Sequence, residues 1–256
     1  MVDLVWVARR VLPLIDLTSL NEDDTDAAVI SLCDQATTAT GPVAAVCVYP
    51  RFVSIAKQAL DERGERRVQV ATVVNFPYGT DALEVTLRGV QAAIAEGADE
   101  IDVVFPFKSL MLADSCPGYE LVRACKEVCG RRRLKVIIES GELREPTLIR
   151  TASLTSIEAG ADFIKTSTGK ARVNATPAAA NIMLEVIRDT GGQCGFKAAG
   201  GIRTVADAAT YLALADNVLG QAWVTPAHFR FGASALLTDI ERVLGHDGIK
   251  VEREGY

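Results

Sequence analysis

A lysine inside a short apolar run is the first residue of this chain whose surroundings indicate chemistry. Lys165 follows Phe163 and Ile164, and the turn Thr168-Gly169-Lys170 comes soon after it. Burial among apolar side chains favours the neutral, nucleophilic amine over the ammonium ion. This is the form that an imine-forming lysine needs. The turn after the lysine offers backbone N–H groups and a positive charge, so it is a predicted phosphate site.

A second lysine has similar surroundings. Lys197 follows Gly195 and Phe196, and the pair Gly200-Gly201 comes shortly after it. Two ammonium groups directed at one site each make protonation of the other more costly. Either lysine alone could instead be a surface charge whose stem packs on the protein while its head reaches water. The repeated pattern favours a shared site.

Two carboxylates also lie in runs that resemble buried strands. Asp16 and Asp102 stand among branched aliphatic residues, and the carboxyl ends of parallel barrel strands meet on one face. These aspartates are therefore predicted to meet Lys165 and Lys197 there. The alternative is a buried ion network that only holds the strands together.

Short β-rich runs alternate with longer helical patterns along the whole chain. The predicted strands are Leu12–Asp16, Ala44–Val48, Val68–Val73, Glu100–Val104, Leu134–Glu139, Phe163–Thr166, Gly195–Ala198 and Phe229–Phe231. The predicted helices are Asp24–Ala36, Arg51–Arg63, Asp81–Glu96, Tyr119–Cys129, Glu145–Glu158, Pro177–Asp189, Val205–Ala215 and Ser234–Leu244. Pro177 after Thr176 and Asp81 after Thr80 are typical helix starts.

Eight such units predict an α/β protein with one closed (β/α)8 TIM barrel. We expect one domain over residues 1–256, with a short helical extension at the N-terminus and a mobile C-terminal tail. An open, doubly wound sheet is the alternative, but the Gly-x-Gly-x-x-Gly turn that usually follows its early strand is missing.

Bulk properties exclude several partner classes. The 256 residues are 49% hydrophobic, with a formal charge of −6, which argues against nucleic acid or an anionic membrane as a partner. No apolar run reaches the length of a membrane-spanning helix, and Arg9-Arg10 interrupt the N-terminal run, so a cytoplasmic protein is expected. The basic run Arg131–Arg133 is predicted to be a solvated loop.

The cysteines and histidines do not predict a metal site. Six cysteines without a secretory signal are better interpreted as free thiols than as disulfides. Cys125 and Cys129 lack the spacing of a Cys-x-x-Cys motif, and only His228 and His246 could supply imidazole ligands. No metal is expected.

Several blocks together resemble the deoxyribose-phosphate aldolases, a family of class I, Schiff-base aldolases with a (β/α)8 barrel. The blocks are Leu14–Thr18, Val46–Pro50, Val74–Pro77, Glu100–Val104, Phe163–Lys170, Val173–Pro177, Phe196–Lys197, Ala199–Arg203 and Arg230–Ser234. They extend from near the N-terminus almost to the end of the chain. The final residue, Tyr256, resembles one branch of the family in which a C-terminal tyrosine reaches the active site.

The resemblance implies a role for each of these charged residues. Lys165 would be the nucleophile, and Lys197 the neighbour that lowers its pKa. Asp102 would move protons through water, and Asp16 would orient Lys197. An unperturbed lysine is neutral in only about one molecule in 2,500 at pH 7, so this chemistry needs a lowered pKa. Tyr256 could deliver a proton to the enamine carbon.

The substrate-binding residues follow from the same resemblance. The predicted phosphate ligands are Thr168, Gly169, Lys170, Gly200, Gly201, Arg203, Gly232 and Ser234. Cys47 is expected to line the pocket, although a small buried core residue is the simpler interpretation. Two residues depart from the family pattern. Ala198 replaces the usual proline, and Ala235 stands where a second serine is frequent.

The implied reaction is reversible cleavage of 2-deoxy-D-ribose 5-phosphate to D-glyceraldehyde 3-phosphate and acetaldehyde, in deoxynucleoside catabolism. It requires no cofactor, and its partners are a phosphorylated sugar and acetaldehyde. Two alternatives stay open: another Schiff-base aldolase with a different donor, and a sugar-phosphate-binding barrel without catalysis. The oligomeric state is also open, and a homodimer is one candidate.

Overall fold

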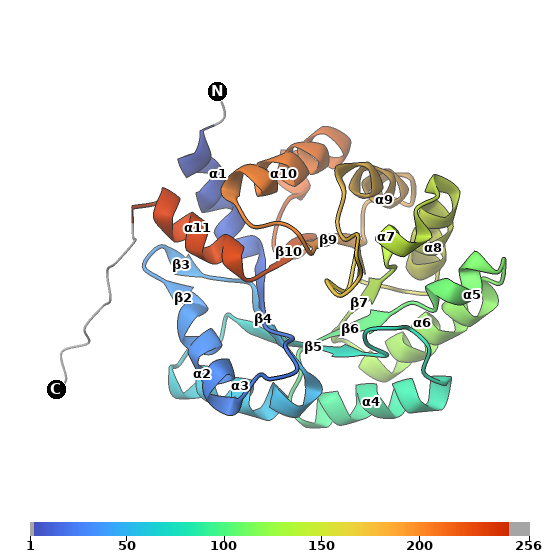
Figure 1. The fold of residues 1–256 in the computed structure, drawn as a ribbon, viewed down its shortest axis with the longest axis horizontal. Helices are drawn as coiled ribbons and strands as arrows, with labels where there is room; N and C mark the ends of the chain where they lie inside the picture. The colour runs from blue at the N-terminus through green and yellow to red at the C-terminus, as the bar shows by residue number, and fades with distance from the viewer. Residues whose placement is uncertain (1–2, 246–256) are drawn as a thin grey trace.

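Eight parallel strands close into a barrel in the computed structural model, which describes residues 3–245 (Figure 1). The strands are β1 (Ile15–Thr18), β4 (Ala45–Val48), β5 (Gln69–Val74), β6 (Glu100–Val104), β7 (Arg133–Ile137), β8 (Phe163–Lys165), β9 (Gly195–Ala199) and β10 (Phe229–Ala233). Each pairs with its neighbours in chain order, and β10 closes the ring against β1. The predicted (β/α)8 barrel is confirmed.

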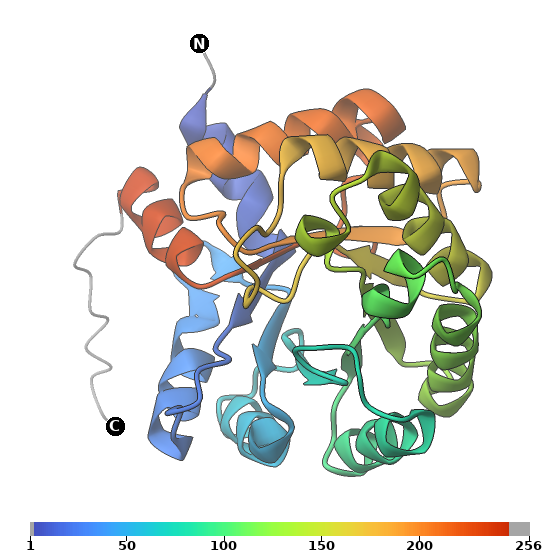
Figure 2. The ribbon, with the colours of Figure 1, turned by 45° about the vertical axis from the view of Figure 1, so that its right-hand side comes forward.

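A ring of helices surrounds the strands, as Figure 2 shows from a second direction. One major helix follows each strand: α2 (Asp26–Gln35), α3 (Val53–Glu62), α4 (Leu83–Ala95), α6 (Cys116–Cys129), α8 (Pro146–Glu158), α9 (Pro177–Asp189), α10 (Val205–Leu219) and α11 (Ala235–Val243). Smaller elements are helix α1 (Leu4–Val11), a 3₁₀ turn at Leu12–Leu14, the strand pair β2 (Thr37–Thr38) and β3 (Gly41–Pro42), and the short helices α5 (Phe107–Met111) and α7 (Ser140–Leu143).

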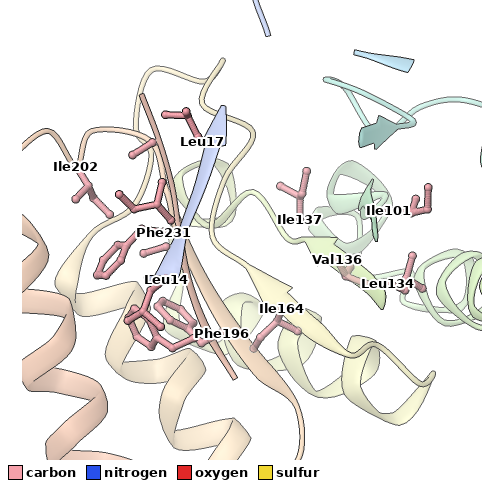
Figure 3. Close-up of a cluster of buried hydrophobic side chains, with 14 of the residues drawn as sticks. Leu14, Leu17, Ile101, Leu134, Val136, Ile137, Ile164, Phe196, Ile202 and Phe231 are labelled. Carbon is pink, nitrogen blue, oxygen red and sulfur yellow. The ribbon is translucent and has the colours of Figure 1, made fainter. Parts of the chain in front are cut away.

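An apolar layer between the strands and the helices supplies most of the buried surface. Figure 3 shows part of this core, including Ile164, Phe196 and Phe231, whose side chains are fully buried. Burying a side chain of this size contributes about 1.5–3 kcal/mol to folding. This layer fixes the barrel's shape and leaves the interior available for a different kind of side chain.

Most element boundaries differ from the sequence-based expectation by one to four residues, and two of these differences have a clear physical reason. Strand β1 begins at Ile15 because Leu12–Leu14 forms the 3₁₀ turn that leads out of α1. Helix α4 begins at Leu83 and not at Asp81, whose backbone N–H donates to Asn75 Oδ1 at 2.8 Å. That bond keeps Asp81 in the loop after β5.

The basic run Arg131–Arg133 is only partly the solvated loop that was predicted. Arg133 is the first residue of β7, and its side chain forms an ion pair with Glu100 at 3.0 Å. Arg132 Nε donates to the carbonyl oxygen of Ala98 at 3.0 Å. The prediction is therefore wrong for Arg133, because a strand that begins with a paired arginine can tolerate the charge at the barrel's rim.

Candidate active site

Strand register brings charged residues from distant parts of the chain side by side. Lys165 on β8 lies opposite Lys197 on β9, and Asp102 on β6 lies opposite Lys135 on β7. All four side chains are buried. Because alternate residues of a barrel strand face inward, these positions place both signs of charge in the interior.

Seven buried charged side chains form a connected group, here called the ionic cluster. Its members are Asp16, Glu100, Asp102, Lys135, Lys165, Lys197 and Arg230, each at most 2% exposed. The sequence singled out four of them. Lys135, Glu100 and Arg230 were missed, although each stands in a predicted strand, which is the signal that had identified Asp16 and Asp102.

Asp102 is the centre of the cluster. One carboxylate oxygen, Oδ1, accepts from Lys135 Nζ at 2.6 Å. The other, Oδ2, accepts from both Lys165 Nζ and Lys197 Nζ at 2.9 Å. The three lysines are thus held around a single carboxylate.

The remaining carboxylates are shared unequally among these lysines. Asp16 lies 2.5 Å from Lys197 Nζ, and Glu100 lies 2.7 Å from Lys135 Nζ. Arg230 joins the two carboxylates, with its guanidinium 2.5 Å from Asp16 and 3.0 Å from Glu100. Lys165 contacts only Asp102 among the carboxylates of the described residues.

Because the carboxylates are shared unequally, the pKa values of the three lysines shift in different directions. Burial and the charge of Lys197 lower the pKa of Lys165, against the opposing carboxylate of Asp102. Burial would also lower the pKa of Lys197, but Asp102 and Asp16 raise it above the ordinary value. The carboxylates around Lys135 raise its pKa in the same way, against burial. Lys165 is therefore the lysine most ready to lose its proton.

The charge balance of the ionic cluster also favours loss of the proton from Lys165. It contains four cationic side chains and three carboxylates, so it carries one net positive charge when every group is ionised. Burial opposes ionisation of the three carboxylates, but the surrounding cations hold their pKa values below the ordinary range. A neutral Lys165 gives a balanced cluster, which a low-dielectric interior favours.

A cavity of about 270 Å³ opens directly above Lys165 at the carboxyl ends of β1, β8, β9 and β10. Its lining includes Lys165 and all eight predicted phosphate ligands: Thr168, Gly169, Lys170, Gly200, Gly201, Arg203, Gly232 and Ser234. This is the end of a (β/α)8 barrel where active sites form. The structure thus brings the candidate nucleophile and the predicted phosphate ligands to one cavity.

Free backbone donors line this cavity. Within residues 3–245, the N–H groups of Gly169, Gly200 and Gly201 have no protein acceptor. All three glycines have φ of +84°, a left-handed conformation that glycine adopts at little cost. Ser234 precedes α11 and so adds a helix N-terminus. Lys170 Nζ currently donates to the Leu20 carbonyl at 2.6 Å.

Residues 10–240 match the sequence model of the DeoC/LacD family aldolases. The chain belongs to this family.

Solved structures support the same placement of this aldolase. A provisionally named deoxyribose-phosphate aldolase from Toxoplasma gondii ME49, in its apo form, is 26% identical, with a TM-score of 0.86 over 94% of this chain and 97% of the other. A protein given the same provisional name, from Coccidioides immitis, is 29% identical, with a TM-score of 0.77 over 91% and 86%. The tetrameric deoxyribose phosphate aldolase from Aeropyrum pernix, at 24% identity and a TM-score of 0.74 over 93% and 96%, shows the shared fold.

Cys47 is not in the cavity lining, although its thiol interacts electrostatically with Lys165 and Lys197. It lies on β4 and is fully buried beside Ala71 and Val73. Burial raises the pKa of its thiol. Tyr256 lies outside the described residues. Of the two departures from the family pattern, Ala198 is buried in β9 and Ala235 lines the cavity as the first residue of α11.

A larger hollow of about 540 Å³ lies between α7, α8 and α9, lined in part by Arg144, Arg172 and Ile182. It contains none of the predicted site residues, so size alone does not identify the active site of the aldolase. The cavity above Lys165 is smaller, but it brings a lysine of lowered pKa and free N–H donors together.

None of the helices between residues 3 and 245 has the length and apolar character that crossing a bilayer needs.

Proposed function

We propose that this aldolase reversibly cleaves 2-deoxy-D-ribose 5-phosphate to D-glyceraldehyde 3-phosphate and acetaldehyde through an imine on Lys165. The observation that carries the proposal is the difference between the buried lysines. Of the three lysines in the ionic cluster, only Lys165 combines a lowered pKa with a place in the cavity lining. Lys197 and Lys135 are equally buried, but they have raised pKa values.

The proposed reaction begins when the neutral amine of Lys165 attacks the aldehyde carbon C1 of the open-chain sugar. Loss of water gives a protonated imine. The proton of the C3 hydroxyl is then removed, the C2–C3 bond breaks, and its electrons flow into the imine to form an enamine. Glyceraldehyde 3-phosphate leaves with C3 as its new aldehyde. Protonation of C2 and hydrolysis release acetaldehyde and regenerate Lys165.

Asp102 is the proposed proton relay. Its carboxylate lies 2.9 Å from Lys165 Nζ and is ionised in the free protein, so it starts as a proton acceptor. Because three lysines stabilise its negative charge, it is a weak base, and we propose that water carries the proton between Asp102 and the C3 hydroxyl. Asp16 and Lys197 keep Asp102 in place through their ion pairs.

The phosphate is proposed to bind at the free N–H groups of Gly169, Gly200 and Gly201, with Ser234 at the start of α11. This arrangement leaves the sugar to extend from the phosphate toward Lys165. Arg203 lines the same cavity and adds positive charge.

We further propose that Tyr256 protonates the enamine and that no cofactor takes part in the reaction. The enzyme is proposed to be cytoplasmic and to act in deoxynucleoside catabolism. A homodimer is one candidate assembly.

Acetaldehyde release from 2-deoxyribose 5-phosphate tests the proposal, with release coupled to alcohol dehydrogenase and NADH. We expect turnover with this substrate and much less with sugar phosphates whose cleavage would give a ketone or a hydroxylated aldehyde. Preference for another donor would identify a different Schiff-base aldolase. Binding of the sugar phosphate without cleavage would identify a non-catalytic barrel.

A further inference from the structure

A buried glutamate lies just outside the cavity, and neither the reaction nor the phosphate site described above uses it. Glu139 follows β7, is 2% exposed and has φ of +54°, a left-handed conformation that costs a non-glycine residue roughly 1–2 kcal/mol. Backbone hydrogen bonds hold it on both sides. The N–H of Ile138 donates to the carbonyl oxygen of Lys165 at 3.0 Å, and the N–H of Ser140 donates to the carbonyl oxygen of Thr166 at 2.8 Å. The fold therefore forces this side chain toward the loop after β8.

The carboxylate of Glu139 binds the first residue of the phosphate turn twice. Thr168 Oγ1 donates to Oε2 at 2.5 Å, and the Thr168 backbone N–H donates to the same oxygen at 3.2 Å. Thr168 Oγ1 in turn accepts from the backbone N–H of Lys170 at 3.1 Å. The carboxylate thus binds Thr168 directly, and Thr168 in turn holds Lys170.

These bonds also determine which N–H groups remain for a ligand. The N–H groups of Thr168 and Lys170 are occupied within the protein, whereas that of Gly169 between them has no acceptor among residues 3–245. Gly169 lines the cavity beside Lys165, but Glu139 does not. Glu139 therefore acts on the phosphate turn through Thr168, although its charge also interacts with Lys165.

No ion pair explains why a charged residue occupies this position. Within the described chain, Glu139 has no cation at ion-pair distance, and burial raises the pKa of its carboxyl against the hydrogen bonds from Thr168 and the charge of Lys165. A buried carboxylate without an ion pair costs free energy. The hydrogen bonds from the Thr168 hydroxyl and backbone N–H offset part of that cost.

We propose that Glu139 is a positioning residue that holds the Thr168–Lys170 turn in the conformation that receives the substrate's phosphate. The inference rests on the proposed function for the identity of the substrate. Glutamine at this position keeps the shape, and its amide oxygen can still accept from both Thr168 donors, but the negative charge is lost and both hydrogen bonds become weaker. The turn is then held less firmly, and the Gly169 N–H is less well placed for the phosphate.

Paired substrates test this role in a Glu139→Gln variant. We expect the ratio of kcat/KM for 2-deoxyribose 5-phosphate to that for 2-deoxyribose to fall about tenfold, the effect of replacing charge-assisted hydrogen bonds with neutral ones. Glu142→Gln is the matched control, because Glu142 lies one helical turn further along and has no bond to the phosphate turn, and its ratio should equal that of the wild type. An unchanged ratio in Glu139→Gln, or equal losses with both substrates, would overturn the proposal.

Binding of inorganic phosphate, measured by calorimetry, does not depend on turnover. If wild type releases no acetaldehyde, the proposed function fails. Weaker phosphate binding in Glu139→Gln than in wild type would still support the positioning role, and equal binding would contradict it.

Discussion

Lys135 and Lys165 are buried to almost the same extent in the barrel interior, yet their surroundings give them opposite pKa shifts. Lys135 Nζ lies 2.6 Å from Asp102 and 2.7 Å from Glu100, with Asp16 at 3.5 Å. Among the carboxylates of residues 3–245, Lys165 Nζ contacts only Asp102, at 2.9 Å, and it borders the cavity. Burial opposes charge on both lysines, so the number of carboxylates decides which one stays protonated. Lys135 has the surroundings of a structural cation, and Lys165 those of a nucleophile.

The largest expected effect on activity follows from Lys165→Met. This variant removes the proposed nucleophile, so turnover should fall by on the order of 10⁴-fold or more. Its free energy of unfolding should change by less than about 1.5 kcal/mol, because the apolar chain has a similar volume and Asp102 keeps Lys135 and Lys197 as partners. Residual activity near the wild-type level would show that Lys165 is not the nucleophile. Coupled turnover assays and urea unfolding measure the two quantities.

Lys135→Met should have its main effect on stability. It leaves Asp102 and Glu100 short of a buried cation, and breaking such a pair costs about 3–5 kcal/mol. Lys57→Met is the control, because the Lys57–Asp99 pair is about one third exposed and should cost less than about 1 kcal/mol. Urea unfolding at neutral pH measures both variants. Similar losses in the two would mean that Lys135 is not the structural cation.

Lys197→Leu should shift the pH profile of the aldolase. The charge of Lys197 lowers the pKa of Lys165, and Lys197 also neutralises part of Asp102. Both effects end in the variant, so the pKa of Lys165 rises and less neutral amine is present at pH 7. Activity should therefore need a higher pH. Each unit by which the pKa of Lys165 rises reduces the fraction of neutral amine at pH 7 about tenfold. A pH–rate profile identical to that of the wild type would count against this role.

The smallest expected effect is that of a chelator. The carboxylates of the ionic cluster bind ammonium or guanidinium groups, and the proposed electron sink is the protonated imine of Lys165. Prolonged treatment with EDTA should leave kcat and KM unchanged. Loss of activity that zinc restores would contradict the imine mechanism.

The sequence predicted the barrel well because its signals are local and repeated. Eight branched, apolar runs alternate with amphipathic runs, and each pattern reflects burial on one element. Boundaries were less certain where tertiary contacts decide them. Asp81 resembles a helix start, but its N–H is bound by Asn75 from the preceding strand's end. No local pattern contains that information.

The site could be predicted only in part for a related reason. Lys165, Lys197, Asp16 and Asp102 stand out as charges in apolar strands, and the same rule applied to Lys135 would have identified a fifth member of the ionic cluster. The partners could not be assigned from sequence, because register decides that Asp102 meets three lysines and Lys165 meets one carboxylate. The pKa difference between the lysines follows from those contacts.

The most direct test of the account is reduction of the enzyme with borohydride in the presence of acetaldehyde, followed by peptide mass spectrometry. The account predicts an ethyl group on Lys165 and none on Lys135 or Lys197. A label on either of those lysines, or no label on any of the three, would contradict it.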